Sequence, residues 1–323
     1  MEHIHYLADP GLESALKVAL ELEMPLLITG EPGTGKTQAA YWAAKALTYE
    51  SADGQSDIPL QTKVLRFNTK TTSVAKDLFY RYDAIRHFRA SRGEQPQAVS
   101  ALQFVSLEAL GKAILAGAPY RRYVVLVDEI DKAPRDFPND VLFEFEEMAF
   151  RIEEADAKDF AELPEHFWQE KLELAELGVA LENVVLEQSV LQLAKGAPKP
   201  LLILTSNSEK NLPDAFLRRC VFYHIPFPEE EERLAEIVSA NVQLSPKYEK
   251  MLGAIIREFL DIRKKGLRKL PATAELVRWV EILAKRKIDL EKANGGDTDM
   301  KKKLLTTYPV LAKNREDLAK LSS

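Results

Sequence analysis

The sequence predicts an α/β fold: a doubly wound parallel sheet of five strands, followed by a smaller all-helical domain. Two observations support this prediction. Five near-continuous apolar runs alternate with helical patterns, as strands do when helices cover both faces of a parallel sheet. After Pro226 and Pro228 the strand signals stop and only helical patterns follow. We therefore predict an α/β domain over residues 1–227 and a helical lid domain with a basic tail over residues 228–323.

The predicted elements follow from apolar periodicity and from the positions of chain breakers. The predicted strands are Pro25–Thr29, Val64–Thr69, Tyr123–Asp128, Pro200–Asn207 and Val221–Phe227. The predicted helices are Lys36–Leu47, Ser106–Ala116, Asn139–Phe150, Glu229–Ala240, Lys247–Lys265 and Thr273–Arg286. From Asn294 the tail opens with turn residues and then becomes basic, which predicts a loosely held helix.

Residues 151–196 differ from the rest of the α/β domain because they are rich in Glu and Leu between two predicted strands. This composition favours a helix, so we predict a helical insertion that projects from the domain. Residues 151–200 contain 11 acidic and 5 basic side chains. The net charge of this segment is therefore −6, which equals the net charge of the whole chain. Two interpretations stay open for the insertion: a surface decoration, or an acidic, leucine-rich arm that docks a partner.

The composition excludes several classes of protein. One cysteine, Cys220, allows no internal disulfide framework, and five scattered histidines suggest no metal cluster. The sequence has no secretory signal pattern and no apolar run near the roughly 20 residues that span a bilayer, so a cytoplasmic enzyme is expected. The acidic balance makes nucleic-acid binding unlikely in general. A local basic groove stays possible, with contributions from Arg81, Arg86, Arg89 and Arg92.

A glycine-rich motif between the first strand and the first helix identifies a nucleotide as the expected ligand. Its residues fit the pattern G-x-x-x-x-G-K-[ST] at every position. The motif comprises Gly30, Glu31, Pro32, Gly33, Thr34, Gly35, Lys36 and Thr37. Glycines let backbone N–H groups turn towards phosphate oxygens at a helix N-terminus. Lys36 is expected to reach the β- and γ-phosphates, and Thr37 to coordinate Mg²⁺.

Polar residues follow two further predicted strands, at the edge where α/β proteins bind ligands. The stretch YVVLVDEID at 123–131 ends its apolar run at Asp128 and Glu129. Asp128 is expected to hold the Mg²⁺ shell, and Glu129 to position and deprotonate the attacking water. The stretch PLLILTSN at 200–207 ends in Ser206 and Asn207, and this neutral amide can hydrogen-bond water or the γ-phosphate.

A short predicted helix, Pro213–Cys220, ends in Arg218 and Arg219. Adjacent arginines at a helix C-terminus have a simple structural explanation, because cations are favoured there.

The order GEPGTGKT, VVLVDEID, LTSN and AFLRRC resembles the AAA+ ATPases and, within them, the MoxR-like branch. The stretch TKTTSVAKDLFYRYDAIRHFR at 69–89 is also similar to MoxR-like proteins, and the resemblance covers roughly residues 10–150 and 198–285. It implies ATP and Mg²⁺ as ligands, a first-sensor role for Asn207, and an arginine finger at Arg219 or, alternatively, Arg218.

Several wider properties follow only from this resemblance. The finger acts in trans in a homo-oligomer, usually a hexameric ring, and the protein remodels or matures a partner in a chaperone-like manner. The implied client is associated with a von Willebrand factor A-type domain protein. Two alternatives stay open: an ATP-gated switch that exposes the acidic insertion to a partner, and a nucleic-acid-associated AAA+ motor.

This sequence departs from many AAA+ proteins at the second sensor. The expected arginine position, in PATAELVRWV at 271–280, falls on Ala274 or Glu275. Arg268, Lys269 and Arg278 are possible substitutes.

Aromatic residues near these motifs have two possible roles. Phe137, Phe143 and Phe145 are expected to pack in the core rather than to grip a substrate. The aromatic and basic stretch Asp77–Arg89 either lines a ring pore or forms a packed helix face.

Overall fold

The computed structural model describes residues 5–50, 57–92, 100–161, 184–185, 190–207 and 210–322. The chain forms two compact units. Unit 1 takes in the N-terminal residues up to Ala8, the loop residues Gly30–Gln38, and the chain from His224 onward. Unit 2 takes in Asp9–Thr29 and Ala39–Tyr223. The predicted domain boundary between residues 227 and 228 stays a prediction.

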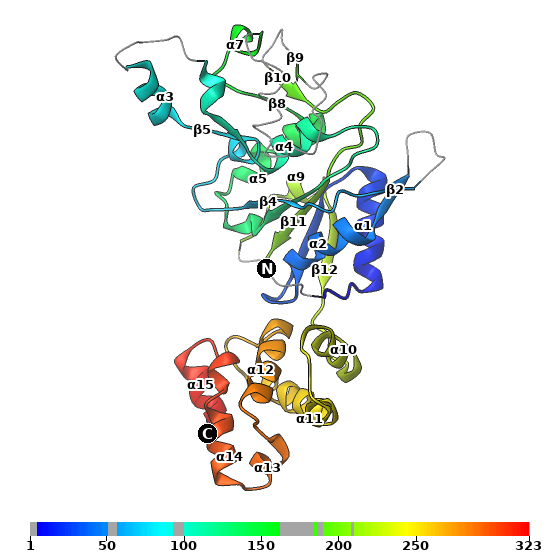
Figure 1. The fold of residues 1–323 in the computed structure, drawn as a ribbon, viewed down its shortest axis with the longest axis vertical. Coiled ribbons are helices and arrows are strands. Elements are labelled where there is room, and N and C mark those ends of the chain that lie inside the picture. Colours follow the sequence, from blue (N-terminus) through cyan, green and yellow to red (C-terminus); the bar gives the residue numbers. More distant parts are fainter. Residues whose placement is uncertain are drawn as a thin grey trace. The chain divides into compact units, whose positions relative to one another are not determined.

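A five-stranded parallel sheet with flanking helices confirms the predicted fold class (Figure 1). Its strand order is β12-β1-β11-β7-β4. The strands are β1 (Leu26–Gly30), β4 (Leu65–Asn68), β7 (Val124–Asp128), β11 (Leu201–Ser206) and β12 (Val221–Ile225). Each lies within one of the five predicted runs or extends it by a single residue. Every residue of β1, β7 and β11 is buried, which explains why these strands are near-continuous apolar runs, with polar residues only towards their carboxyl ends, rather than alternating.

Helices accompany the sheet. They include α1 (Pro10–Leu22), α2 (Lys36–Ala46), α4 (Ala109–Ala116) and α9 (Asp214–Leu217). Helix α1 was not predicted, α2 and α9 lie within predicted helices, and α4 starts later than its predicted helix. The predicted helix Ser106–Ala116 is wrong at its first residues, since Val105–Leu107 form strand β6, which pairs with β5 (Tyr80–Tyr82). Helix α3 (Ala84–Ser91) lies between these two strands in the chain.

The predicted helix Asn139–Phe150 is divided in the structure. It becomes α5 (Phe137–Asp140), α6 (Leu142–Glu147) and then strand β8 (Ala149–Arg151). Met148 ends α6 in the left-handed conformation, at φ 48°, which turns the chain into the strand. Phe137 and Phe145 are buried as predicted, but Phe143 is 68% exposed, so its predicted core position is wrong.

The helical interpretation of residues 151–196 is wrong for much of what the structure describes. Strand β10 (Val190–Gln192) pairs antiparallel with β8 on one side and with β9 (Val184–Val185) on the other. Helix α7 (Ala157–Ala161) is the described helical part. Apolar side chains at strand spacing, Phe150, Ile152 and Leu191, are buried and fix this small sheet to unit 2. The remaining residues of the predicted insertion lie outside the described ones.

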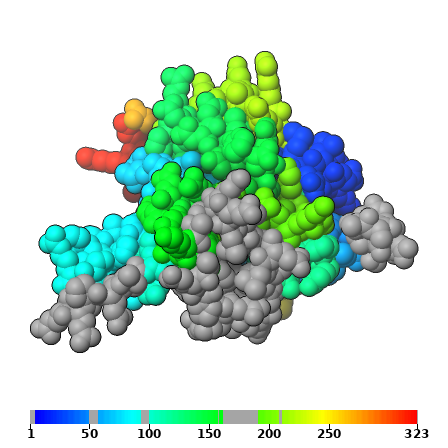
Figure 2. All heavy atoms as spheres, turned by 90° about the horizontal axis from the view of Figure 1, so that it is seen from above, coloured from blue at the N-terminus to red at the C-terminus, as the bar shows by residue number. Residues whose placement is uncertain are grey.

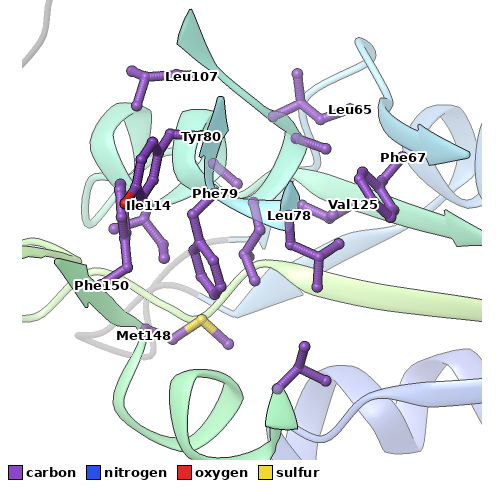
Figure 3. Close-up of a cluster of buried hydrophobic side chains, with 14 of the residues drawn as sticks. Leu65, Phe67, Leu78, Phe79, Tyr80, Leu107, Ile114, Val125, Met148 and Phe150 are labelled. Atoms are coloured by element: carbon purple, nitrogen blue, oxygen red, sulfur yellow. The ribbon is translucent and has the colours of Figure 1, made fainter. Parts of the chain in front are cut away.

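The stretch Asp77–Arg89 combines a packed segment and an exposed one. Phe79 and Tyr80 stack against Phe150 in the core of unit 2, as Figure 3 shows. Helix α3 buries none of its residues, and Ile85 and Phe88 are exposed on it. The cyan spheres of this segment gather at one side of the face in Figure 2. The predicted packed helix face is therefore wrong, because the packed first half of the stretch is a 3-10 turn followed by strand β5, and the helix of the second half is not packed.

Unit 1 contains the C-terminal helices, as the loss of strand signals after Pro226 predicts. They are α10 (Glu231–Asn241), α11 (Pro246–Arg263), α12 (Thr273–Lys285), α13 (Leu290–Asn294), α14 (Thr298–Leu305) and α15 (Arg315–Ser322). The tail is packed rather than loosely held, which corrects the prediction. Leu304, Tyr308 and Leu311 are buried in the same cluster as Trp279 of α12. The Trp279 indole also donates a hydrogen bond to the Thr307 hydroxyl at 2.8 Å.

Replacing Leu311 with Ala is expected to destabilise unit 1 by about 2–5 kcal/mol, because it leaves a cavity in a closed core. Urea unfolding of the full chain, followed by far-ultraviolet circular dichroism, measures this change. Leu270→Ala is the matched control, since Leu270 is 44% exposed whereas Leu311 is fully buried. Equal midpoints for the two variants would show that the tail does not contribute to the core.

Candidate nucleotide site

The glycine-rich loop begins where β1 ends and closes at the first residue of α2. Gly33 and Gly35 have φ angles of +86° and +88°, a region that only glycine adopts readily. The Lys36 ammonium donates to the carbonyl oxygens of Gly30 at 2.8 Å and Glu31 at 2.9 Å. Because α2 starts at Lys36, the loop ends at a helix N-terminus, where backbone donors favour phosphate groups.

The same loop is held by residues of unit 1 that lie more than 200 positions away in the sequence. The Thr273 hydroxyl and the Ala274 N–H both donate to the Gly33 carbonyl oxygen, at 2.9 and 3.3 Å. Arg263 Nη2 donates to the Glu31 carboxylate at 3.1 Å, and its guanidinium lies 3.5 Å from the centre of the Phe227 ring. The start of α12 thus fixes the backbone of the loop at Gly33, and the end of α11 holds the Glu31 side chain.

The expected second-sensor position, Ala274 or Glu275, lies at this contact. A Cβ atom on Gly33 would lie 3.2 Å from the Glu275 carboxylate and 3.4 Å from the Ala274 methyl group. Arg268 instead forms an ion pair with Glu316 at 2.8 Å, and Arg278 is exposed.

The N-terminal segment also approaches the loop within unit 1. A Cβ atom on Gly35 would lie 2.7 Å from the Tyr6 ring, so Gly35 makes room for this aromatic side chain. The Asn241 side chain holds the segment by accepting from His5 N and donating to His5 O, each at 3.1 Å. Arg233 donates to the Leu7 carbonyl oxygen at 2.8 Å.

In unit 2 the polar strand ends lie side by side through the register of the sheet. Asn68 of β4 is opposite Asp128 of β7, which β11 flanks on the other side. Asp128 is buried, and both of its carboxylate oxygens are engaged. The Thr205 hydroxyl donates to Oδ1 at 2.6 Å, and Arg66 Nη2 donates to Oδ2 at 2.6 Å.

Glu129 directly follows Asp128 in an unusual backbone conformation. Its φ of 58° and ψ of 52° are left-handed, a conformation that costs about 1–3 kcal/mol for such a residue and clusters at functional sites. Its N–H donates to the Thr205 hydroxyl at 2.8 Å. Asn207 Nδ2 donates to Glu129 Oε1 at 3.3 Å, and Lys132 Nζ donates to Oε2 at 2.5 Å. The structure therefore brings Asp128, Glu129 and Asn207 together, as predicted for their strand ends.

The two candidate finger arginines have different surroundings at the end of α9. Arg219 Nε donates to the Glu146 carboxylate at 2.5 Å, and its Nη1 donates to the Ala215 carbonyl oxygen at 3.2 Å. Arg218 is exposed, and its side chain makes no hydrogen bond or ion pair with the part of the chain that the structure describes, whereas its backbone N–H donates to the Asp214 carbonyl oxygen at 3.1 Å. Burial raises the pKa of the adjacent Cys220 thiol to about 12, so this cysteine stays protonated and unreactive at neutral pH.

The oxygen donors available fit a hard divalent cation. The Asp128 carboxylate of unit 2 and the Thr37 hydroxyl of unit 1 are each a kind of ligand that Mg²⁺ takes alongside substrate phosphates. Among the described residues, no group of three or more His, Cys, Asp or Glu side chains suits a metal on its own. None of the described helices is long and apolar enough to cross a membrane.

A buried strand, a glycine-rich loop with its lysine, a helix, and a second strand that ends in Asp-Glu define the class of P-loop nucleotide-binding proteins. Residues 25–220, more than half of the chain, match the family described as AAA domain (dynein-related subfamily). The chain belongs to this family.

Two further comparisons add little. A solved structure of a RuvB variant from Thermotoga maritima is 15% identical and has a TM-score of 0.39, with 93% of this chain and 67% of that chain covered. A similarity of this size supports no argument about function. No curated protein matches the sequence.

Proposed function

We propose that this protein is a Mg²⁺-dependent ATPase of the MoxR-like branch, and that it works as a cytoplasmic homo-oligomeric ring to remodel a partner protein. Membership of the AAA family supports nucleotide hydrolysis in general. The contact of Asn207 with Glu129, beside the buried Asp128, is the observation that carries the proposal for this chain. The Asn207 amide orients one oxygen of the Glu129 carboxylate and the Lys132 ammonium orients the other. A carboxylate oriented in this way can accept a proton from water, whereas a kinase site must exclude water.

The residues have separate roles in this proposal. Backbone N–H groups of Gly33 to Thr37 and the Lys36 ammonium bind the phosphates of ATP. Mg²⁺, when bound, neutralises phosphate charge, and Asp128 and Thr37 would hold it. Glu129 takes a proton from the water that attacks the γ-phosphorus, while the bond to the β–γ bridging oxygen breaks. Asn207 keeps the Glu129 carboxylate oriented for this proton transfer.

The finer parts of the proposal depend on motif order. Arg219, or alternatively Arg218, completes the site of a neighbouring copy as an arginine finger. The resemblance to AAA+ ATPases implies that the copies form a hexameric ring. The client is a protein that carries or accompanies a von Willebrand factor A-type domain. Hydrogen bonds from Thr273 and Ala274 to Gly33 link the start of α12 directly to the phosphate loop within unit 1.

Lys36→Ala is expected to weaken ATP binding at least about tenfold, because it removes the cation that contacts the phosphates. Isothermal titration of ATP into the purified chain measures this loss. Lys45→Ala is the matched control, since Lys45 lies at the other end of the same helix and is exposed. Equal affinities for the two variants would reject Lys36 as a phosphate ligand.

A further inference from the structure

The guanidinium of Arg66 already pairs with Asp128, the predicted metal ligand. Arg66 Nη2 lies 2.6 Å from Asp128 Oδ2, while Thr205 takes the other carboxylate oxygen at 2.6 Å. The Asp128 side chain is 8% exposed and the Arg66 side chain 28% exposed. A buried carboxylate requires a compensating charge, and Arg66 supplies it from the edge strand β4.

The contact between Arg66 and Asp128 is weaker than a typical structural ion pair of this type. Arginine usually grips a carboxylate with two parallel N–H groups, which adds energy and fixes the geometry. Here a single N–H of Arg66 points at Asp128, and the buried Arg66 Nε has no hydrogen-bond partner among the described residues. A guanidinium with one unsatisfied buried donor loses less hydrogen-bond free energy when it leaves its partner than a guanidinium whose donors are all satisfied.

We propose that Arg66 is a positioning residue that holds Asp128 in place of Mg²⁺ and so sets how readily the metal binds. This inference rests on the proposed function, in which Asp128 holds the metal. Two cations compete for one carboxylate oxygen, so metal binding includes the work of displacing Arg66. Removal of Arg66 takes away one of the two cations that compete for Asp128 Oδ2, and the carboxylate then binds a divalent cation more tightly.

A purely structural role for Arg66 predicts the opposite change. If Arg66 only keeps Asp128 in position, its loss disorders the carboxylate and weakens metal binding. The direction of the change in metal affinity therefore separates the two roles.

The experiment measures how much Mg²⁺ strengthens binding of a non-hydrolysable ATP analogue. The full-length chain is titrated with the analogue in Mg²⁺ and in EDTA, and the ratio of the two affinities is the Mg²⁺ factor. In Arg66→Met this factor is expected to rise about tenfold, the scale of one charge-assisted hydrogen bond. Arg66→Gln, which keeps a neutral donor for Asp128 and so protects folding, is expected to change in the same direction.

Three controls keep the outcomes distinct. Arg81→Met is the matched substitution, because Arg81 also pairs with a carboxylate, Glu108 at 2.9 Å, but lies on β5, outside the five-stranded sheet. The Mg²⁺ factor of this variant should equal that of the wild type. Absence of analogue binding to the wild type, or an unchanged factor in Asp128→Asn, would reject the proposed function itself. If both of those tests pass, a factor that is unchanged or lower in Arg66→Met and Arg66→Gln overturns the inference.

Discussion

Replacing Glu129 with Gln is expected to leave ATP binding intact and to reduce ATP turnover by about 10²–10⁴-fold, the usual contribution of a general base. Glutamine has nearly the same shape as glutamate, and its amide oxygen can still accept the hydrogen bond from Asn207. It cannot take a proton from the attacking water. Release of inorganic phosphate measures turnover, and titration of a fluorescent ATP analogue measures binding.

A matched control for this prediction is Glu147→Gln. Glu147 is an exposed glutamate at the end of α6, and its substitution should change neither turnover nor binding. Turnover in Glu129→Gln within a factor of a few of the wild-type rate would show that another group activates the water.

The second large effect is expected at the arginine pair. Loss of an arginine finger reduces turnover by about 10³–10⁵-fold, because transition-state charge on the γ-phosphoryl group is no longer neutralised. Arg219→Ala is expected to show this loss, and Arg218→Ala is the test of the alternative. The ion pair of Arg219 with Glu146 means that Arg219 must leave an intramolecular partner to reach a neighbouring copy.

Glu146→Gln separates the finger role from a structural one. It removes the charge that holds Arg219 but keeps the arginine, so turnover should be retained or increased. If Glu146→Gln lowers turnover as strongly as Arg219→Ala, then the ion pair itself is what the activity requires. If Arg218→Ala shows the larger loss, the finger is Arg218.

The sheet was predictable because burial determines both its composition and its position. The runs that become β1, β7 and β11 are apolar on both faces, a pattern that few other structures produce. Residues 139–150 show where this argument stops. Their helical periodicity is real in α6, but the left-handed Met148 and the pairing of β8 with β10 depend on a partner strand about 40 residues later.

The predicted site residues were readable from strand ends and loop spacing, but their partners were not. Thr205 and Arg66 contact Asp128 only because of the register between neighbouring strands. The contact of Lys132 with Glu129 could have been predicted from the DEIDK stretch, because oppositely charged side chains three residues apart often meet. Thr273 contacts Gly33 across 240 residues, and no local pattern indicates such a pairing.

The central claim, that one copy of the chain completes the ATPase site of another, is tested most directly by mixing two inactive variants. Arg219→Ala copies keep the phosphate loop, and Lys36→Ala copies keep the finger, so a mixed assembly contains some complete sites. Phosphate release is measured for each variant alone and for the mixture at the same total concentration. The mixture is expected to recover a measurable part of the wild-type rate, and a mixture no faster than either variant alone would contradict the claim.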